Sequence, residues 1–213
     1  MRILVTAGPT REPIDPVRFL SNRSTGKMGY AIAEAGAERG HDVLLISGPV
    51  SLQKPASVRL INVITAAEMQ KAVRENVNWC QALVMAAAVA DWRPRTVYTR
   101  KLKKNEIPPE LRLERTPDIL STIHDLKKNR LYAGFAAETE NLISEASRKL
   151  EEKGLDLIVA NDVSRPDSGF EVDTNKVTLL TSEGMAEELP VMSKREVANR
   201  ILNWIENHAK GEG

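Results

Sequence analysis

Short apolar runs alternate with segments of helical periodicity through most of this chain. The apolar runs are rich in β-branched residues, have the length of buried strands and fall at 3–6, 43–46, 82–87, 132–135 and 155–159. Between them, apolar residues recur at helical spacing near 27–39, 66–76, 117–127 and 140–153. Such alternation favours right-handed βαβ crossovers. We predict an α/β fold, Rossmann-like and doubly wound, with a mainly parallel sheet, helices on both faces and ligands at the carboxyl ends of the strands.

The last third of the chain departs from this alternation. Val177, Leu179 and Leu180 precede a polar turn at 182–184 and a further apolar residue, Leu189, which predicts a hairpin or mixed edge at 176–189. Residues 194–208 place their apolar side chains on one helical face and predict a closing helix. We therefore expect a single domain over residues 1–213, with a frayed tail at 209–213.

Residues that favour helix ends lie at three of the predicted boundaries. Thr25 can cap a helix that begins near Lys27, and Gly40 stands where a C-terminal glycine belongs. Thr116 followed by Pro117 is typical of a cap with proline in the first turn.

Charge and cysteine content exclude several classes of function. Basic and acidic residues number 30 and 29, a balance that does not favour nucleic acid as a partner. Cys80 is the single cysteine, so the chain can hold neither an internal disulfide nor a multi-cysteine metal site, and we expect a cytoplasmic protein. No apolar run approaches the roughly 20 residues that span a bilayer, so we expect no membrane association.

The connection after the first predicted strand is long and chemically loaded. Residues 8–20 contain three prolines, and loops of this length in compact domains are usually functional or disordered. Residues 21–29 then bring hydroxyls, backbone amides and a helix N-terminus together, which are the conditions for binding an anion. We take Ser24, Thr25 and Gly26 as a candidate phosphate loop within the active site.

Other interpretations of this loop are possible. A P-loop would need glycine at position 21 and a hydroxyl at position 28, where the chain has Ser21 and Met28. A dinucleotide fingerprint keeps Gly26 and Gly29 but lacks its first glycine and the acid that binds ribose. An NAD(P)-dependent reductase of the short-chain type commonly carries a Tyr-x-x-x-Lys pair, which none of the three tyrosines forms. A non-catalytic nucleotide-binding module and an ordinary capped helix stay open as alternatives.

A second irregular segment follows the predicted strand at 82–87. Its small residues would let a ligand approach the backbone closely, and Asp91 could meet a metal ion or a hydroxyl there. The basic run at 100–104 suits phosphates, although such runs are also common on solvated surface loops.

Taken together, these segments closely resemble the phosphopantothenoylcysteine synthetases, the ligases that in many bacteria form the C-terminal half of a bifunctional coenzyme A biosynthesis protein. The matching motifs are collinear and extend over nearly the whole chain, at residues 7–18, 21–29, 87–91, 101–104, 117–119, 134–139 and 160–164.

The resemblance implies a two-step amide ligation. The carboxylate of 4'-phosphopantothenate attacks the α-phosphate of CTP and gives an acyl-cytidylate and pyrophosphate; the amine of cysteine then displaces CMP. Magnesium accompanies CTP and is expected to be held mainly by the triphosphate, with unknown protein ligands. No enzyme nucleophile is required, which fits a lone Cys80 with no histidine paired in sequence, and no flavin is expected in this domain.

Site residues follow by resemblance. Asn22 would hold the acyl-nucleotide during the cysteine step, where its side-chain amide could donate to the developing oxyanion. Arg18 would act in the same substrate loop. Lys101 would lie on a flap at about 92–106 that closes over the site, and would offset charge on the reacting phosphate. Nucleotide contacts carry over to Met85, Ala86, Ala87, Asp91, Lys101, Pro117, Asp118, Ile119, Leu120, Phe135, Lys149 and Lys153. Lys149 and Lys153 are four apart and share one face of a predicted helix, where they could grip a triphosphate or simply pair with Glu145 or Glu152.

The resemblance also bears on partners. The family is dimeric, and an exposed sheet edge near 176–180 could pair across a two-fold axis. The family's flavin-dependent decarboxylase half has no counterpart in these 213 residues, which suits either a separately encoded synthetase or an excised domain that is fused to, or associates with, such a decarboxylase.

Overall fold

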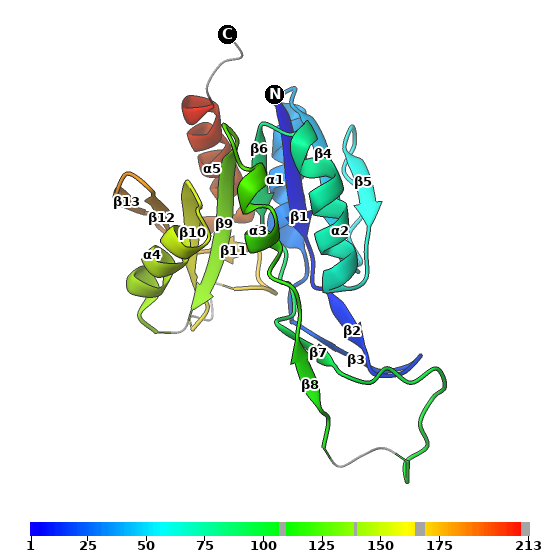
Figure 1. Ribbon diagram of the computed structural model, residues 1–213. Coiled ribbons are helices and arrows are strands. Elements are labelled where there is room, and N and C mark those ends of the chain that lie inside the picture. The colour runs from blue at the N-terminus through cyan, green and yellow to red at the C-terminus, as the bar shows by residue number, and fades with distance from the viewer. Residues whose placement is uncertain (107–109, 139, 165–168, 210–213) are drawn as a thin grey trace.

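A computed structural model describes residues 1–106, 110–138, 140–164 and 169–209. Its centre is an eight-stranded sheet in the order β13-β12-β10-β9-β6-β1-β4-β5 (Figure 1). The strands are β1 (Arg2–Ala7), β4 (Asp42–Ser47), β5 (Arg59–Asn62), β6 (Ala82–Met85), β9 (Leu131–Glu138), β10 (Leu157–Asp162), β12 (Val177–Thr181) and β13 (Ala186–Glu188). The strands from β10 to β5 pair in parallel, whereas β12 and β13 are antiparallel. The predicted mainly parallel α/β sheet is confirmed; β5 was not among the predicted strands.

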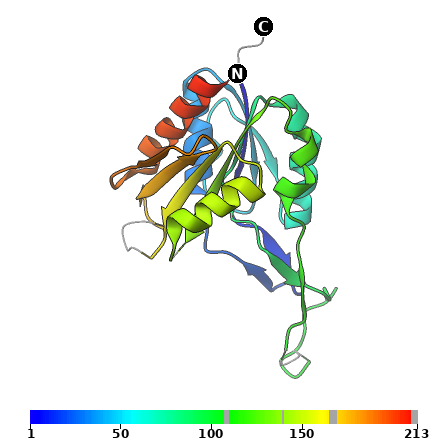
Figure 2. The same ribbon diagram turned by 60° about the vertical axis from the view of Figure 1, so that its left-hand side comes forward.

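Helices cover both faces of this sheet. On one face α1 (Lys27–Glu38) packs against α5 (Lys194–His208); on the other lie α2 (Ala66–Asn76), α3 (Ile119–Thr122) and α4 (Leu142–Glu152) (Figures 1 and 2). The two faces differ because successive side chains of a strand point in opposite directions. In β1, Ile3 and Val5 join the buried cluster beneath α1 and α5, whereas Leu4 joins the cluster beneath α2.

Two short hairpin-like pairs project below the carboxyl ends of the parallel strands. The first pairs β2 (Arg11–Pro13) with β3 (Phe19–Ser21), and the second pairs β7 (Trp92–Pro94) with β8 (Leu113–Arg115). Figure 1 shows them side by side at the base of the molecule, with the loop after β7 extending furthest from the sheet. We call the described residues 92–106 and 110–115 the arm; the flap expected at 92–106 is its first part. A further two-stranded pair joins β11 (Thr174–Asn175) to β14 (Met192–Ser193).

Two predicted helix caps are wrong. Gly26, at a φ of 80°, occupies the cap position of α1, and the Thr25 hydroxyl donates instead to the carbonyl oxygen of Phe170 at 2.8 Å. Asp118 caps α3, while the Thr116 hydroxyl donates to the carbonyl of Ala90. In both cases a carbonyl distant in sequence takes the hydroxyl that a local pattern assigns to the helix.

The helix expected at 117–127 is shorter than predicted. It consists of α3 and a 3-10 turn at His124–Leu126, separated by Ile123, whose φ of −118° lies outside the helical range. Gly40 has a φ of 82° and directly follows the C-terminal turn of α1, as expected of a C-terminal glycine.

The C-terminal hairpin is confirmed, but the expected sheet edge is misplaced. Strand β12 is buried and paired on both sides, so residues 176–180 offer no free edge. The edge is β13, where Glu187 pairs with Arg200 and Glu188 with Lys176. Charged residues on an edge strand disfavour pairing with a second sheet.

The expected frayed tail falls largely on residues 210–213, which lie outside the described residues, as does Thr139 of the 134–139 motif. Across the described residues, no helix combines the length and apolar composition that a bilayer-spanning segment requires.

Candidate active site

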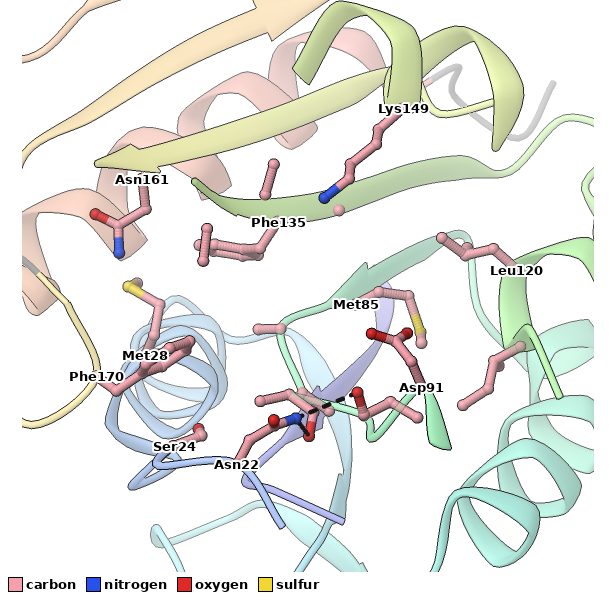
Figure 3. A pocket seen from close by; sticks show the side chains of 18 of the residues that line it. Asn22, Ser24, Met28, Met85, Asp91, Leu120, Phe135, Lys149, Asn161 and Phe170 are labelled. Carbon is pink, nitrogen blue, oxygen red and sulfur yellow. Dashed lines mark hydrogen bonds between the residues drawn. The ribbon is translucent and has the colours of Figure 1, made fainter. Parts of the chain in front are cut away.

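A pocket of about 760 Å³ opens at the carboxyl ends of β6 and β9, between the start of α1 and the starts of α3 and α5. Figure 3 shows Ser24, Met28, Phe170 and Asn161 on one side and Met85, Asp91 and Leu120 on the other. It lies where parallel α/β sheets usually bind ligands. It gathers most of the predicted site residues: Asn22, Ser24, Gly26, Met85, Ala86, Ala87, Asp91, Pro117, Asp118, Ile119, Leu120, Phe135, Lys149 and Lys153.

Buried threonines hold the floor of the pocket in place. The Thr6 hydroxyl accepts from the amide of Ala87 at 3.2 Å, and the Thr10 hydroxyl accepts from the amide of Ala90 at 2.9 Å. Both threonines are fully buried. The segment after β6 is therefore rigidly positioned while its small side chains leave room for a ligand beside the backbone.

Close backbone packing behind this floor depends on glycine. A Cβ on Gly48 would lie 1.8 Å from the carbonyl oxygen of Pro9, and one on Gly29 would lie 2.5 Å from the Cβ of Ala7. Glycine at these positions lets the loop after β1 pack between β4 and the first turn of α1.

Asn22 bridges the loop before α1 and the segment after β6. Its Nδ2 donates to the carbonyl oxygens of Ala88 at 3.0 Å and Val89 at 3.3 Å (Figure 3). The amide nitrogen has two protons, one for each of these carbonyls, whereas Oδ1 can only accept. Donation to an oxyanion, the role expected from sequence, would require the amide to leave one of these carbonyls.

The start of α1 presents backbone donors to the pocket. The first intrahelical bond runs from the amide of Tyr30 to the carbonyl of Gly26, so the amides of residues 27–29 lack helical partners. Gly26 has no side chain to cap them, and Ser24 Oγ accepts from the Gly26 amide at 3.3 Å. Lys27 also lines this side of the pocket. The amides and the helix N-terminus favour an anionic ligand, which would compete with Asp173 for Lys27, since Lys27 Nζ lies 2.7 Å from Asp173 Oδ1.

Lys149 of α4 and Lys153, directly after the helix, line the pocket, and each forms an ion pair with an acidic residue. Lys149 Nζ lies 2.5 Å from Glu138 Oε1, and Lys153 Nζ pairs with the carboxylate of Asp118. Pairing with Glu145 or Glu152 is therefore wrong, since both of those glutamates bind Arg148 on the exposed side of the helix. Lys149 and Lys153 thus face the pocket together, as their spacing predicts.

A third lysine, Lys194, lies buried at the start of α5. Its Nζ donates to the carbonyl oxygens of Gly169, at 2.9 Å, and Val172. Burial, with the nearby charge of Lys27 as a second cause, lowers the pKa of Lys194 to about 8. These bonds hold residues 169–172 against the pocket side that Ser24 and Asn161 line.

Three predicted residues lie elsewhere. Thr25, Arg18 and Lys101 are not among the described residues that line the pocket. Thr25 binds Phe170 at its margin, whereas Arg18 pairs with Asp15 and donates to the carbonyl of Leu102, next to Lys101.

Sequence reasoning missed several lining residues, including Arg115, Thr116, Asn161, Asn175 and Lys194. Asn161 lies near the end of β10 within the 160–164 motif, so the strand-end rule that singled out 86–91 could have found it. Lys194 had no such signal, because it begins a helix whose pattern concerns only packing.

The described residues contain no cluster of three or more His, Cys, Asp or Glu side chains that could hold a metal ion. Asp91 and Asp118 line the pocket as single carboxylates. Magnesium commonly binds through one or two carboxylates plus substrate phosphates, so these residues fit an ion that arrives with a nucleotide.

Residues 1–209 match the family described as DNA/pantothenate metabolism flavoprotein C-terminal domain. The Coenzyme A biosynthesis bifunctional protein CoaBC of Bacillus subtilis (strain 168) is 48% identical over 212 residues, covering 99% of this chain and 52% of that protein. The CoaBC protein of Vibrio vulnificus (strain CMCP6) is 46% identical over 207 residues, with coverages of 96% and 51%.

The same relationship holds in three dimensions. A crystal structure of the C-terminal domain of Coenzyme A biosynthesis bifunctional protein CoaBC superposes with a TM-score of 0.83 at 44% identity, covering 97% of this chain and 94% of that one. The chain spans about half the length of the full-length relatives it matches. Sequence and fold agree, and the chain belongs to the DNA/pantothenate metabolism flavoprotein C-terminal domain family.

Proposed function

We propose that this chain is a phosphopantothenate–cysteine ligase that consumes CTP. The observation that carries the proposal is the pocket itself, because the start of α1, Asn22 and two lysines, Lys149 of α4 and Lys153 directly after it, all line it. A reaction between a phosphorylated acid and a nucleoside triphosphate needs two such phosphate-binding regions. The relatives' name, a bifunctional coenzyme A biosynthesis protein, supports this chemistry.

In this proposal the two substrates occupy opposite sides of the pocket. The phosphate of 4'-phosphopantothenate binds near Ser24, Gly26 and Lys27, where backbone amides and a cation converge. Oxygens of the triphosphate take the place of the Glu138 carboxylate at Lys149 and of the Asp118 carboxylate at Lys153. Met85, Ala86, Ala87 and Phe135 then accommodate the base, and the segment from Pro117 to Leu120 accommodates the sugar.

The reaction proceeds in two balanced steps. The pantothenate carboxylate attacks the α-phosphorus, the bond to the β-phosphate oxygen breaks, and pyrophosphate leaves. The cysteine amine then attacks the acyl carbon, loses a proton and expels CMP. The protein contributes orientation and charge stabilisation rather than a nucleophile. Magnesium would neutralise triphosphate charge, and Asp91, a carboxylate of the pocket lining, would help to hold such an ion.

Asn22 has a more specific role than the sequence suggests. Because its Nδ2 is engaged by the carbonyls of Ala88 and Val89, Oδ1 is the atom that faces substrates. Oδ1 can accept from the incoming amine of cysteine and orient its lone pair, without any change in the protein. Donation to the oxyanion stays a prediction that requires the amide to turn.

The decisive experiment follows pyrophosphate release with CTP, magnesium and phosphopantothenate, with and without cysteine, across the four ribonucleoside triphosphates. We expect release with CTP above the other three, and CMP together with the amide product once cysteine is added. Release of no pyrophosphate combined with tight NADPH binding would favour the reductase alternative. Nucleotide binding without turnover would favour a non-catalytic module.

We also propose partners and a location for this protein. The relatives are twice as long and bifunctional, which supports fusion to, or association with, a flavin-dependent decarboxylase. Large apolar side chains are exposed around β3 and the arm, at Val17, Phe19, Trp92, Val97 and Leu113, and such patches mark interfaces. We therefore place the homodimer contact there rather than at residues 176–180. A buried free thiol at Cys80 suits a reducing cytoplasm.

A further inference from the structure

The arm is tied to the loop after β2 through one buried carboxylate. Asp15 is only 3% exposed, yet it accepts bonds from three directions. Its Oδ1 accepts from the amides of Val17 and Arg18, both at 2.9 Å, and its Oδ2 binds the guanidinium of Arg18. The third contact comes from the arm, where the amide of Leu102 donates to Oδ2 at 3.2 Å.

Two further hydrogen bonds join the arm to the loop after β2. The carbonyl oxygen of Leu102 accepts from Arg18 Nη2 at 3.0 Å, and the amide of Tyr98 donates to the carbonyl of Ile14 at 2.9 Å. The side chain of Leu102 is itself buried, at 5% exposed. We call Asp15, Arg18 and Leu102 the clasp. It fixes the main chain of the arm on the C-terminal side of Lys101, and the Tyr98 bond fixes it on the other side.

The attachment of the arm depends on the ionised form of the Asp15 carboxylate, which pairs with the positive charge of Arg18. The pKa of Asp15 is held well below its usual range, first by the bond from Arg18, while burial acts in the opposite direction. A neutral amide at this position could accept from the same backbone amides but would leave the buried side of the Arg18 guanidinium without a counter-charge. The turn at 15–18 would therefore survive the loss of charge better than the attachment of the arm.

We propose that Asp15 is a positioning residue for Lys101: through Arg18 and the main chain of Leu102 it determines where the flap presents the lysine. This inference rests on the proposed ligase function only for the role of Lys101 at the active site, which is to offset charge on the reacting phosphate. Asp15 contacts no substrate in this arrangement, since it lies outside the described pocket lining and acts through the arm alone.

Two readouts test the clasp in Asp15→Asn. The first is limited trypsin digestion, because Arg100, Lys101, Lys103 and Lys104 are cleavage sites on the tethered segment. We expect cleavage at 100–104 to be at least tenfold faster than in the wild type, with little change in the thermal midpoint. Asp15→Glu, which keeps the charge, should restore part of the protection. Glu114→Gln is the matched control, because it removes the 2.7 Å ion pair with Arg93 on the same arm without touching the clasp.

The second readout is a double-mutant cycle with Lys101→Ala, measured by pyrophosphate release. If Asp15 acts through Lys101, Asp15→Asn lowers kcat roughly tenfold with little change in KM for CTP, and causes no further loss in the Lys101→Ala background. Additive losses, or a trypsin pattern like that of the wild type, would overturn the proposal. If the wild type released no pyrophosphate, the ligase function and the role of Lys101 would fail together, whereas the trypsin comparison would still decide whether Asp15 holds the arm.

Discussion

The side-chain nitrogen of Asn22 donates to the main-chain oxygen of Ala88 at 3.0 Å, across 66 positions of sequence. This bond joins the loop before α1 to the segment after β6, which are the two irregular segments that the sequence singles out. It also orients Asn22, whose Oδ1 has no hydrogen-bond partner within the part of the chain that the structure describes and can accept from a ligand in the pocket.

Asn22→Asp tests that orientation. A carboxylate cannot donate, so it would repel the carbonyls of Ala88 and Val89 and turn away from them. We expect pyrophosphate release to persist while the cysteine step slows at least a hundredfold, so that an acyl-nucleotide accumulates and can be trapped by acid quench and identified by mass spectrometry. Full turnover in this variant would show that Asn22 has been given the wrong role.

Lys149→Gln tests the nucleotide side of the pocket. Removing one of the two cations that face it should raise KM for CTP about tenfold, equivalent to about 1.4 kcal/mol, with a smaller change in KM for cysteine. Arg148→Gln is the control, because this neighbour on α4 pairs with Glu145 and Glu152 away from the pocket. Equal effects of the two substitutions would mean that net charge, rather than position, governs nucleotide affinity.

Gly29→Ala tests the packing of α1 on β1. Alanine favours helices over glycine, but its Cβ would lie 2.5 Å from the Cβ of Ala7 and 2.8 Å from the carbonyl oxygen of Thr6. We expect a net loss of about 1–3 kcal/mol in the free energy of unfolding by urea. Gly40→Ala, where no atom lies within 4 Å, isolates the cost of a positive φ, about 1 kcal/mol. A stabilised Gly29→Ala variant would contradict the tight contact.

The buried thiol of Cys80 offers a pH test. Burial raises the pKa of Cys80 to about 11, so at pH 8 the folded protein holds an unreactive thiol. We expect native protein to react with a disulfide reagent at least a hundredfold more slowly than protein in urea. Because the folded pKa exceeds the unfolded value, the stability that this group contributes is fully present below about pH 9 and is lost as the pH rises toward 11. The stability difference between wild type and Cys80→Ala should therefore shrink over that range.

Light scattering can locate the dimer contact. We expect the wild type to have twice the 23.6 kDa chain mass, and Val97→Asp or Leu113→Lys to shift it toward the monomer because each puts a charge into the apolar patch on the arm. Met185→Lys, at a still more exposed position in the β12–β13 turn, should leave the mass unchanged. A dimer lost only in the Met185 variant would return the interface to the C-terminal hairpin.

Local periodicity was enough to predict most of the sheet and its helices. The apolar runs that form β1, β4, β6, β9 and β10 are buried on both faces, and strands of this kind can be predicted from composition alone. The closing helix matches its predicted range of 194–208, because its apolar stripe is a local pattern. Strand β5 was missed, since its four residues are only partly buried and show little contrast with their surroundings.

Much of the candidate site was also accessible from sequence, because the ends of parallel strands meet at one edge of a sheet. That rule and the family motifs predict that Asn22, Met85, Asp91 and Lys149 lie together, and all four line one pocket. They could not show which acids Lys149 and Lys153 face, nor that Nδ2 of Asn22 is bonded to the carbonyls of Ala88 and Val89.

Tertiary structure alone decided the partners of polar groups. The hydroxyls of Thr25 and Thr116 suit helix caps by local pattern, yet each binds a carbonyl that only the folded chain brings within reach. Asp15 meets Leu102 across 87 positions, and Lys194 meets Gly169 from a different element. Hydrophobic periodicity depends on residues that are near one another in the sequence, so the sequence alone reveals it. A hydrogen bond requires two atoms about 3 Å apart, and strand register, loop path and burial decide which distant atoms come that close.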